Sequence, residues 1–256
     1  MYKRLIILTV ALCYASLAFA IGKPSAMWGY SGSKGPANWA TLHPSYHMCD
    51  SGLRQSPIDI YKVKYGHAEH LRFHYHPMPL VLINNSITLK ALVPENIKDE
   101  FIIYQNEKFY LHDIHVHCPS EHKLNHAQYP LELHLVHTDN KGHFLVLAVF
   151  MREGEENSVL GKNLKNVPDR EFKRTVIADE TVNPNNVLPK HLDFYEYAGS
   201  LTTPPCTENV QWLVMATPIQ ASKKQIKLFS ERLYSNNARP VQPLNLRRVL
   251  LHKVIS

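Results

Sequence analysis

Histidines and acids are concentrated in one short stretch, DIHVHCPSEH, at residues 113–122. If the residues leading into it form a strand, the alternation of side chains places Asp113, His115 and His117 on one face. Two imidazoles at positions i and i+2 of one face can approach a single ion. The stretch therefore predicts a metal site, and a catalytic zinc site with an open position needs a third protein ligand.

The segment LELHLVH at residues 131–137 supplies a candidate for that ligand. Alternation puts Glu132, His134 and Val136 on one face, and the segment can run antiparallel to the first strand. We predict that His134 is the third ligand, with water in the fourth position. Ligation by imidazoles alone, at tetrahedral geometry, favours zinc over calcium or magnesium.

Each predicted strand also carries an acid two residues before a histidine ligand. Asp113 precedes His115, and Glu132 precedes His134, on the same face. A carboxylate in that place can accept the other N–H of the ligand and so orient the imidazole. The alternative for Glu132 is an exposed strand acid, but the leucines that alternate with it predict that the opposite face is buried.

A second His-x-His pair has the same spacing. His74 and His76 lie in the sequence LRFHYHP, without a second histidine-bearing strand of matching pattern nearby. A bare His-x-His motif carries a high false-positive risk. We therefore interpret this pair as surface or packing histidines.

Short strand-like runs, separated by turn residues, make up most of the chain. The runs lie at residues 80–83, 101–104, 109–117, 131–137, 144–151 and 210–217. Seventeen prolines fit an irregular β protein better than a helical bundle. Residues 145–150 are apolar without alternation, as expected of a central strand covered on both faces. The best helix candidate is 222–233, with Ile226, Phe229 and Leu233 on one side.

The N-terminus has the anatomy of a secretory signal peptide. A short basic start precedes the apolar residues 5–19, and Ala18-Phe19-Ala20 fits a cleavage site. The rival interpretation, an uncleaved membrane anchor, is disfavoured because the apolar run is short. We predict a signal peptide at 1–20 and an exported protein at 21–256, without a stable membrane span after cleavage. It would be periplasmic in a bacterium and secreted otherwise.

The exported part has no linker, low-complexity tract or repeat, so we predict one mostly β domain. The formal charge is +6, and removal of Lys3 and Arg4 with the signal peptide leaves +4. The basic residues are scattered among acids, which gives nucleic-acid binding no support.

Export permits a disulfide, and three cysteines remain after cleavage, at Cys49, Cys118 and Cys206. One must stay unpaired, and we expect it to be Cys118, which directly follows the histidine run. A Cys49–Cys206 bond would tie the threonine loop before Cys206 to the N-terminal part of the chain.

These stretches resemble the α-class carbonic anhydrases. The chain has the family's His-x-His strand, then Ser-Glu-His, then Glu-Leu-His-Leu-Val-His, in that order. Further matches are spread over most of the exported chain, at 28–30, 54–60, 199–206, Asn237 and 239–244. So many ordered matches are highly specific. The resemblance implies a single catalytic domain on a large, mainly antiparallel twisted central sheet with short peripheral helices.

The resemblance also implies an activity, the reversible hydration of carbon dioxide to bicarbonate and a proton by zinc-bound hydroxide. Neutral ligands leave the full charge of the ion to acidify its water, whose pKa is about 7 in carbonic anhydrases. Thr202 would orient the hydroxide, and Glu121 would accept the hydrogen bond of the threonine hydroxyl. The alternatives are an ordinary turn threonine and a structural salt-bridge acid.

Pocket and supporting residues follow from the same resemblance. The apolar wall for carbon dioxide would be Val136, Val146, Leu201 and Trp212. Thr203 would line the polar side where bicarbonate lies, and Asn237 would offer its backbone carbonyl to His117. The supporting residues behind the site would be His122, Tyr197 and Ser56.

Two positions depart from the family pattern. Asp113 stands where the family usually has glutamine, so a shorter and chargeable group faces His115. Ile87, in the sequence NNSI, stands where the family has a histidine that passes protons to solvent. Isoleucine carries no proton, and Lys90 is a poor substitute because the pKa of lysine is normally too high. We therefore expect slowed turnover.

Two other functions are alternatives. A binding or structural protein of the same fold typically lacks a ligand histidine, whereas this chain has all three. A zinc hydrolase of unrelated fold would have a general base beside the water and no threonine that orients it, and the Leu-Thr-Thr-Pro-Pro loop argues against this alternative. The expected partners are carbon dioxide and bicarbonate, without nucleic acid, and the expected state is a monomer or homodimer.

Overall fold

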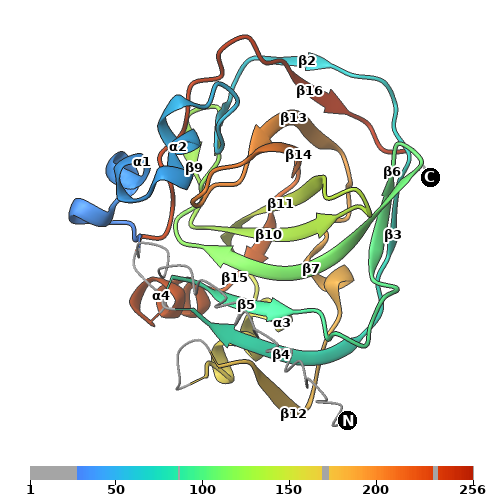
Figure 1. The fold of residues 1–256 in the computed structure, drawn as a ribbon. Helices are drawn as coiled ribbons and strands as arrows, with labels where there is room; N and C mark the ends of the chain where they lie inside the picture. The colour runs from blue at the N-terminus through green and yellow to red at the C-terminus, as the bar shows by residue number, and fades with distance from the viewer. Residues whose placement is uncertain (1–27, 86, 169–172, 233–235, 256) are drawn as a thin grey trace, which may run out of the picture.

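The computed structural model describes residues 28–85, 87–168, 173–232 and 236–255. The predicted signal peptide and Ser86 lie outside these residues. Most strands belong to one twisted sheet that runs through the whole molecule, and the helices are short and peripheral (Figure 1). No helix in these residues is long and apolar enough to cross a membrane.

The large sheet contains thirteen strands. Its main path is β12 (Thr175–Val182), β4 (Met78–Asn84), β5 (Leu89–Leu92), β7 (Glu107–His117), β10 (Leu131–Thr138), β11 (Phe144–Glu153), β14 (Glu208–Met215), β13 (Phe194–Ser200), β16 (Val249–His252) and β2 (Val63–Tyr65). Off this path are β15 (Ile219–Ala221), β6 (Phe101–Tyr104) and β3 (Leu71–His74). A small second sheet holds β1 (Asp59–Ile60), β8 (Lys123–Leu124) and β9 (Ala127–Gln128).

Most neighbouring strands of the large sheet are antiparallel, as predicted. The pairs β11–β14, β11–β15 and β16–β2 are parallel, so the sheet is mixed. All six predicted strands are present, as β4, β6, β7, β10, β11 and β14, with small shifts at some ends. The predicted fold class is therefore confirmed.

Helices flank the sheet. The α-helices are α1 (Trp39–Leu42), α2 (Met48–Ser51), α3 (Ser158–Lys165) and α4 (Lys223–Arg232), and the 3₁₀ turns are η1 (Gly32–Lys34), η2 (Pro36–Asn38), η3 (Pro44–Tyr46) and η4 (Pro184–Val187). The predicted helix at 222–233 is α4. Ser222 caps its start, because the Ser222 hydroxyl accepts the N–H of Gln225 at 3.2 Å. Leu233, predicted for its apolar side, lies outside the described residues.

The centre of the sheet is buried on both faces. Residues 145–151 of β11 are all buried, which agrees with the absence of alternation in their sequence. Leu145, Leu147 and Val149 pack in one apolar cluster with the leucines of β10, whereas Val146 and Ala148 pack in a second cluster with Trp212. Full burial stabilises a leucine by about 1.5–3 kcal/mol, so these faces fix the strands that carry the histidines.

A disulfide joins Cys49 on α2 to Cys206 in the loop between β13 and β14. Cys118 is a buried free thiol. Both findings confirm the sequence prediction. Gln55 adds a second tie, because its side-chain amide donates to the carbonyl of Cys206 at 3.1 Å. The loop before Cys206 is thus held against the N-terminal part of the chain.

Candidate metal centre

The three predicted ligands lie on two neighbouring strands at the centre of the sheet (Figure 1). The antiparallel register of β7 and β10 pairs His115 with His134 and His117 with Glu132. Ring centroids are 5.2 Å apart for His115 and His117, 5.3 Å for His115 and His134, and 4.6 Å for His117 and His134. One nitrogen of each ring lies within 4.8 Å of the other two, so the rings can share one ion.

Each imidazole is held by an oxygen acceptor on its other nitrogen. The acceptors are carboxylates or a carbonyl, so the held nitrogen carries the proton. The opposite nitrogen then presents a lone pair to the shared centre. The three pairs are His115 Nδ1 and Asp113 Oδ1 at 2.6 Å, His117 Nδ1 and Asn237 O at 2.7 Å, and His134 Nε2 and Glu132 Oε1 at 2.7 Å.

The electrostatics of this cluster fit a cation. Burial, with the nearby Lys90 cation, lowers the pKa of His115 to about 3, and burial lowers the pKa of His117 as well. Both imidazoles are therefore neutral at physiological pH. His117 Nε2 is buried and has no hydrogen-bond partner among the described residues. A buried lone pair without a partner is costly, and three converging imidazole nitrogens suit a divalent ion such as zinc.

A second group of possible ligands, His122, Glu132 and His134, is also close enough to share an ion. Its contacts favour a supporting role. Glu132 Oε1 lies 2.6 Å from His122 Nδ1 and 2.7 Å from His134 Nε2. Burial alone would raise the pKa of Glu132, but these two imidazoles hold it well below its usual value. The carboxylate thus bridges the two rings.

The predicted supporting residues form one buried chain behind His134. From Glu132 the chain passes to His122, whose Nε2 lies 2.6 Å from the Tyr197 hydroxyl. The Tyr197 hydroxyl donates to Ser56 Oγ at 2.9 Å, and burial raises the pKa of Tyr197 well above its usual value. The orientation of His134 therefore depends on residues from three distant parts of the chain.

Glu121 is buried beside the histidines. Its Oε1 accepts the backbone N–H of Arg239 at 2.9 Å, and its Oε2 lies 3.5 Å from His117 Nε2. Oε2 has no hydrogen-bond partner among the described residues. Thr202 is 6% exposed, and the described residues show no hydrogen bond between its side chain and Glu121. The pairing of Thr202 with Glu121 therefore stays a prediction.

A cavity of about 270 Å³ opens above the three histidines. The residues predicted for its walls all line it, namely Val136, Val146, Leu201, Trp212 and Thr203, and so does Thr202. Ile87 lines it too. Trp28, Tyr30, Thr88 and Phe144 also line the cavity without having been predicted from the sequence, and so does Lys90, which was considered only as a proton carrier.

The other His-x-His pair is built differently. His74 Nδ1 lies 2.9 Å from the carbonyl of Asp99, and its ring stacks on Phe101 at 4.4 Å between centroids. His76 Nδ1 lies 3.2 Å from Glu100 Oε1. Neither histidine belongs to a group of three possible metal ligands in the described ranges. These contacts are those of packing histidines at the surface.

Comparison with known proteins decides the family. A family model described as eukaryotic-type carbonic anhydrase matches residues 34–253. The chain belongs to this family. This confirms the family and the enzyme class that the sequence predicted.

Relatives and solved structures agree with the match. The chain is 40% identical to a carbonic anhydrase of Nostoc sp. over 87% of this chain and 85% of that protein. It is 35% identical to a carbonic anhydrase of Pectobacterium carotovorum, over 98% of this chain and 99% of that protein. The structure of α-carbonic anhydrase from Thermovibrio ammonificans with the inhibitor sulfanilamide superposes with a TM-score of 0.83, at 39% identity, covering 89% of this chain and all of that one.

Proposed function

We propose that this carbonic anhydrase hydrates carbon dioxide reversibly with zinc held by His115, His117 and His134. The observation that carries the proposal is the convergence of three imidazole nitrogens at a cavity lined by both apolar and polar side chains. Zinc bound there would supply a Lewis acid that lets water lose a proton near neutral pH. Asp113, Glu132 and the carbonyl of Asn237 aim the three rings.

The apolar wall suits carbon dioxide, which has no charge and no hydrogen to donate. Val146 and Trp212 are nearly inaccessible to solvent, and the Trp212 indole N–H donates to the carbonyl of Ser200 at 3.0 Å. The polar atom of this side chain is therefore occupied, and its ring presents apolar surface. Leu201 and Val136 also line the cavity, and Thr203, another lining residue, would give bicarbonate a polar group.

Thr202 and Glu121 would orient the attacking oxygen. One oxygen of Glu121 is held by the N–H of Arg239, so the other is left to accept the Thr202 hydroxyl. A threonine that donates to a carboxylate can still accept from a second partner. With its hydrogen donated to Glu121, the Thr202 oxygen could only accept, so the attacking group would have to donate a hydrogen bond to it.

Proton release would depend on the solvent. Ile87 occupies the position of the usual relay, and among the described residues the only histidines that line the cavity are the three ligands. We propose that external buffer accepts the proton. We also propose export after cleavage of residues 1–20, since the Cys49–Cys206 bond suits an oxidising compartment.

Stopped-flow hydration of carbon dioxide tests the proposal. The purified exported chain should be active with zinc and inhibited by sulfanilamide, the inhibitor bound in the Thermovibrio ammonificans structure. Thr202→Val should lower kcat roughly 10²-fold, the scale of losing one oriented hydrogen-bonding group, while zinc content stays unchanged. The matched control is Thr41→Val, at an exposed site on α1. An inactive zinc-loaded wild type would contradict the proposal.

A further inference from the structure

Lys90 and Asp113 form an ion pair in the wall of the metal cavity. Lys90 Nζ lies 3.2 Å from Asp113 Oδ2, while Asp113 Oδ1 lies 2.6 Å from His115 Nδ1. The register of β5 and β7 makes Lys90 the direct partner of His115. Lysine, aspartate and histidine therefore form a continuous chain that ends at a predicted metal ligand.

The carboxylate of Asp113 depends on this lysine. Asp113 is 9% exposed, and the Lys90 side chain is 28% exposed. Among the described residues, only His115 and Lys90 donate hydrogen bonds to the carboxylate of Asp113. An ion pair that loses one partner leaves a buried charge without compensation, which is strongly unfavourable.

Glu132, which holds His134, is supported in another way. Its Oε2 accepts the backbone N–H of His122 at 2.8 Å, and its Oε1 is shared by the rings of His122 and His134. A backbone donor cannot leave its place without a change in fold. Among the described residues the Asp113 carboxylate has no backbone donor, so Lys90 is its one hydrogen-bond donor besides the ligand His115 itself.

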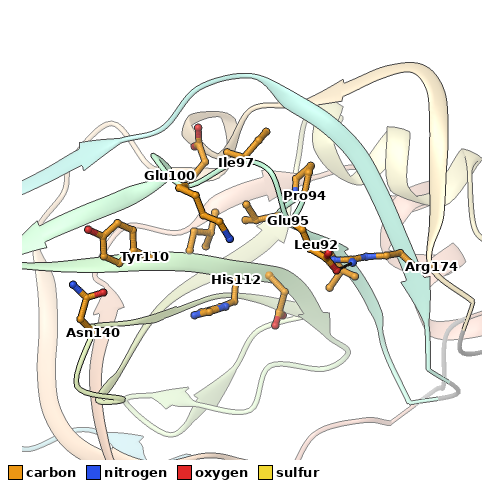
Figure 2. Close-up of a pocket in the computed structure, with 13 residues that line it drawn as sticks. Leu92, Pro94, Glu95, Ile97, Glu100, Tyr110, His112, Asn140 and Arg174 are labelled. Carbon is orange, nitrogen blue, oxygen red and sulfur yellow. Dashed lines mark hydrogen bonds and ion pairs between the residues drawn. The ribbon is translucent and has the colours of Figure 1, made fainter.

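A second hollow borders Asp113. This hollow, of about 620 Å³, lies among the segment after β5, the strand β7 and Arg174 (Figure 2). Glu95, His112 and Arg174 are among its lining residues (Figure 2). Of the described residues, only Asp113 lines both this hollow and the metal cavity.

We propose that Lys90 is a positioning residue of the metal centre. Its ammonium holds the Asp113 carboxylate against His115 Nδ1, and thereby fixes the tautomer and direction of His115. A charged acceptor makes imidazole a stronger ligand than a neutral one does. Lys90 compensates the charge that this acceptor brings into the wall. The inference rests on the proposed zinc function and extends it to retention of the metal.

The rate of zinc loss to a chelator tests this role without reference to activity. Lys90→Met should release zinc about tenfold faster, the low end of the effect of groups that orient a ligand. Lys90→Arg should restore slow release, because it keeps the charge and a donor. Lys108→Met, which removes an exposed lysine at the far end of β7, is the matched control.

A double-mutant cycle separates positioning from a general structural effect. In the Asp113→Gln background the acceptor is neutral, so Lys90→Met should change zinc release by less than about twofold. Equal acceleration in both backgrounds, or no acceleration with Asp113 present, would overturn the role of Lys90. A wild type that binds no zinc would overturn the proposed function itself, and the two failures are therefore distinguishable.

Discussion

His115 and His134 are direct partners in the antiparallel pairing of β7 and β10, with ring centroids 5.3 Å apart. A slip of one residue would turn every side chain of one strand to the other face. Leu131, Leu133 and Leu135 are fully buried on the face of β10 opposite His134. Their packing opposes such a slip, so the apolar face of the strand secures the register that assembles the metal face.

Ile87→His should accelerate turnover in weak buffer. Without a relay, the rate of proton loss to water is limited to roughly 10³ s⁻¹, from an encounter rate near 10¹⁰ M⁻¹s⁻¹ and a pKa of about 7. Fast members of the family reach roughly 10⁶ s⁻¹. The wild-type rate should therefore rise with the concentration of an imidazole buffer, and the histidine variant should flatten that dependence.

Ile87→Val is the control for this change, since it alters the side chain without adding a proton carrier. It should keep the wild-type dependence on buffer. A wild type that is already fast in weak buffer and indifferent to added imidazole would show that another group carries the proton.

Loss of the Cys49–Cys206 bond should lower the free energy of unfolding by up to about 5 kcal/mol. The two cysteines are 157 residues apart, so the bond restricts a long loop of the unfolded chain, and strain or residual structure would reduce the figure. Urea unfolding of Cys49→Ser and Cys206→Ser measures the loss. The Cys118→Ser variant, which breaks no bond, should lose much less, and an equal loss there would refute the assignment.

Acid should destabilise the protein through His137. Burial lowers its folded-state pKa to about 3, below the value of about 6.5 in an unfolded chain. Between these values the unfolded chain binds the extra proton. The stability is therefore fully present above pH 6.5 and falls towards pH 3, by up to about 1.4 kcal/mol per pH unit.

His137→Gln should flatten this slope in urea titrations of the zinc-free protein at several pH values. His126→Gln is the matched control, because the His126 side chain is 70% exposed. The prediction concerns the slope and not the absolute stability, since His137 also lies 2.6 Å from the Tyr75 hydroxyl. An unchanged slope in the His137 variant would be evidence against a neutral buried imidazole.

Local pattern was enough to predict the ligand strands. Alternation placed the histidines and their acids on one face of β7 and of β10, and the apolar run of β11 predicted a strand buried on both faces. These features depend on side-chain period and burial, which a sequence carries directly. The family resemblance then supplied residues from distant loops, such as Asn237, whose carbonyl lies 2.7 Å from His117 Nδ1.

Features that depend on long-range register were not predictable in this way. The pairing of β5 with β7 brings Lys90 to Asp113, and alternation within either strand does not specify it. The parallel pairing of β11 with β14 was not predicted for the same reason, because it joins strands that are far apart in the sequence. The role of Arg239 was missed too, because its guanidinium donates to the carbonyls of Cys49 and Ser56, far away in sequence.

Zinc content and carbon dioxide hydration, measured together on three proteins, test the central claim most directly. The wild type should bind about one zinc per chain and hydrate carbon dioxide, as expected for a three-histidine site. His134→Ala should lose both the metal and the activity, whereas His74→Ala should keep both. Zinc retained by His134→Ala, or lost from His74→Ala, would contradict the assignment of the metal centre to β7 and β10.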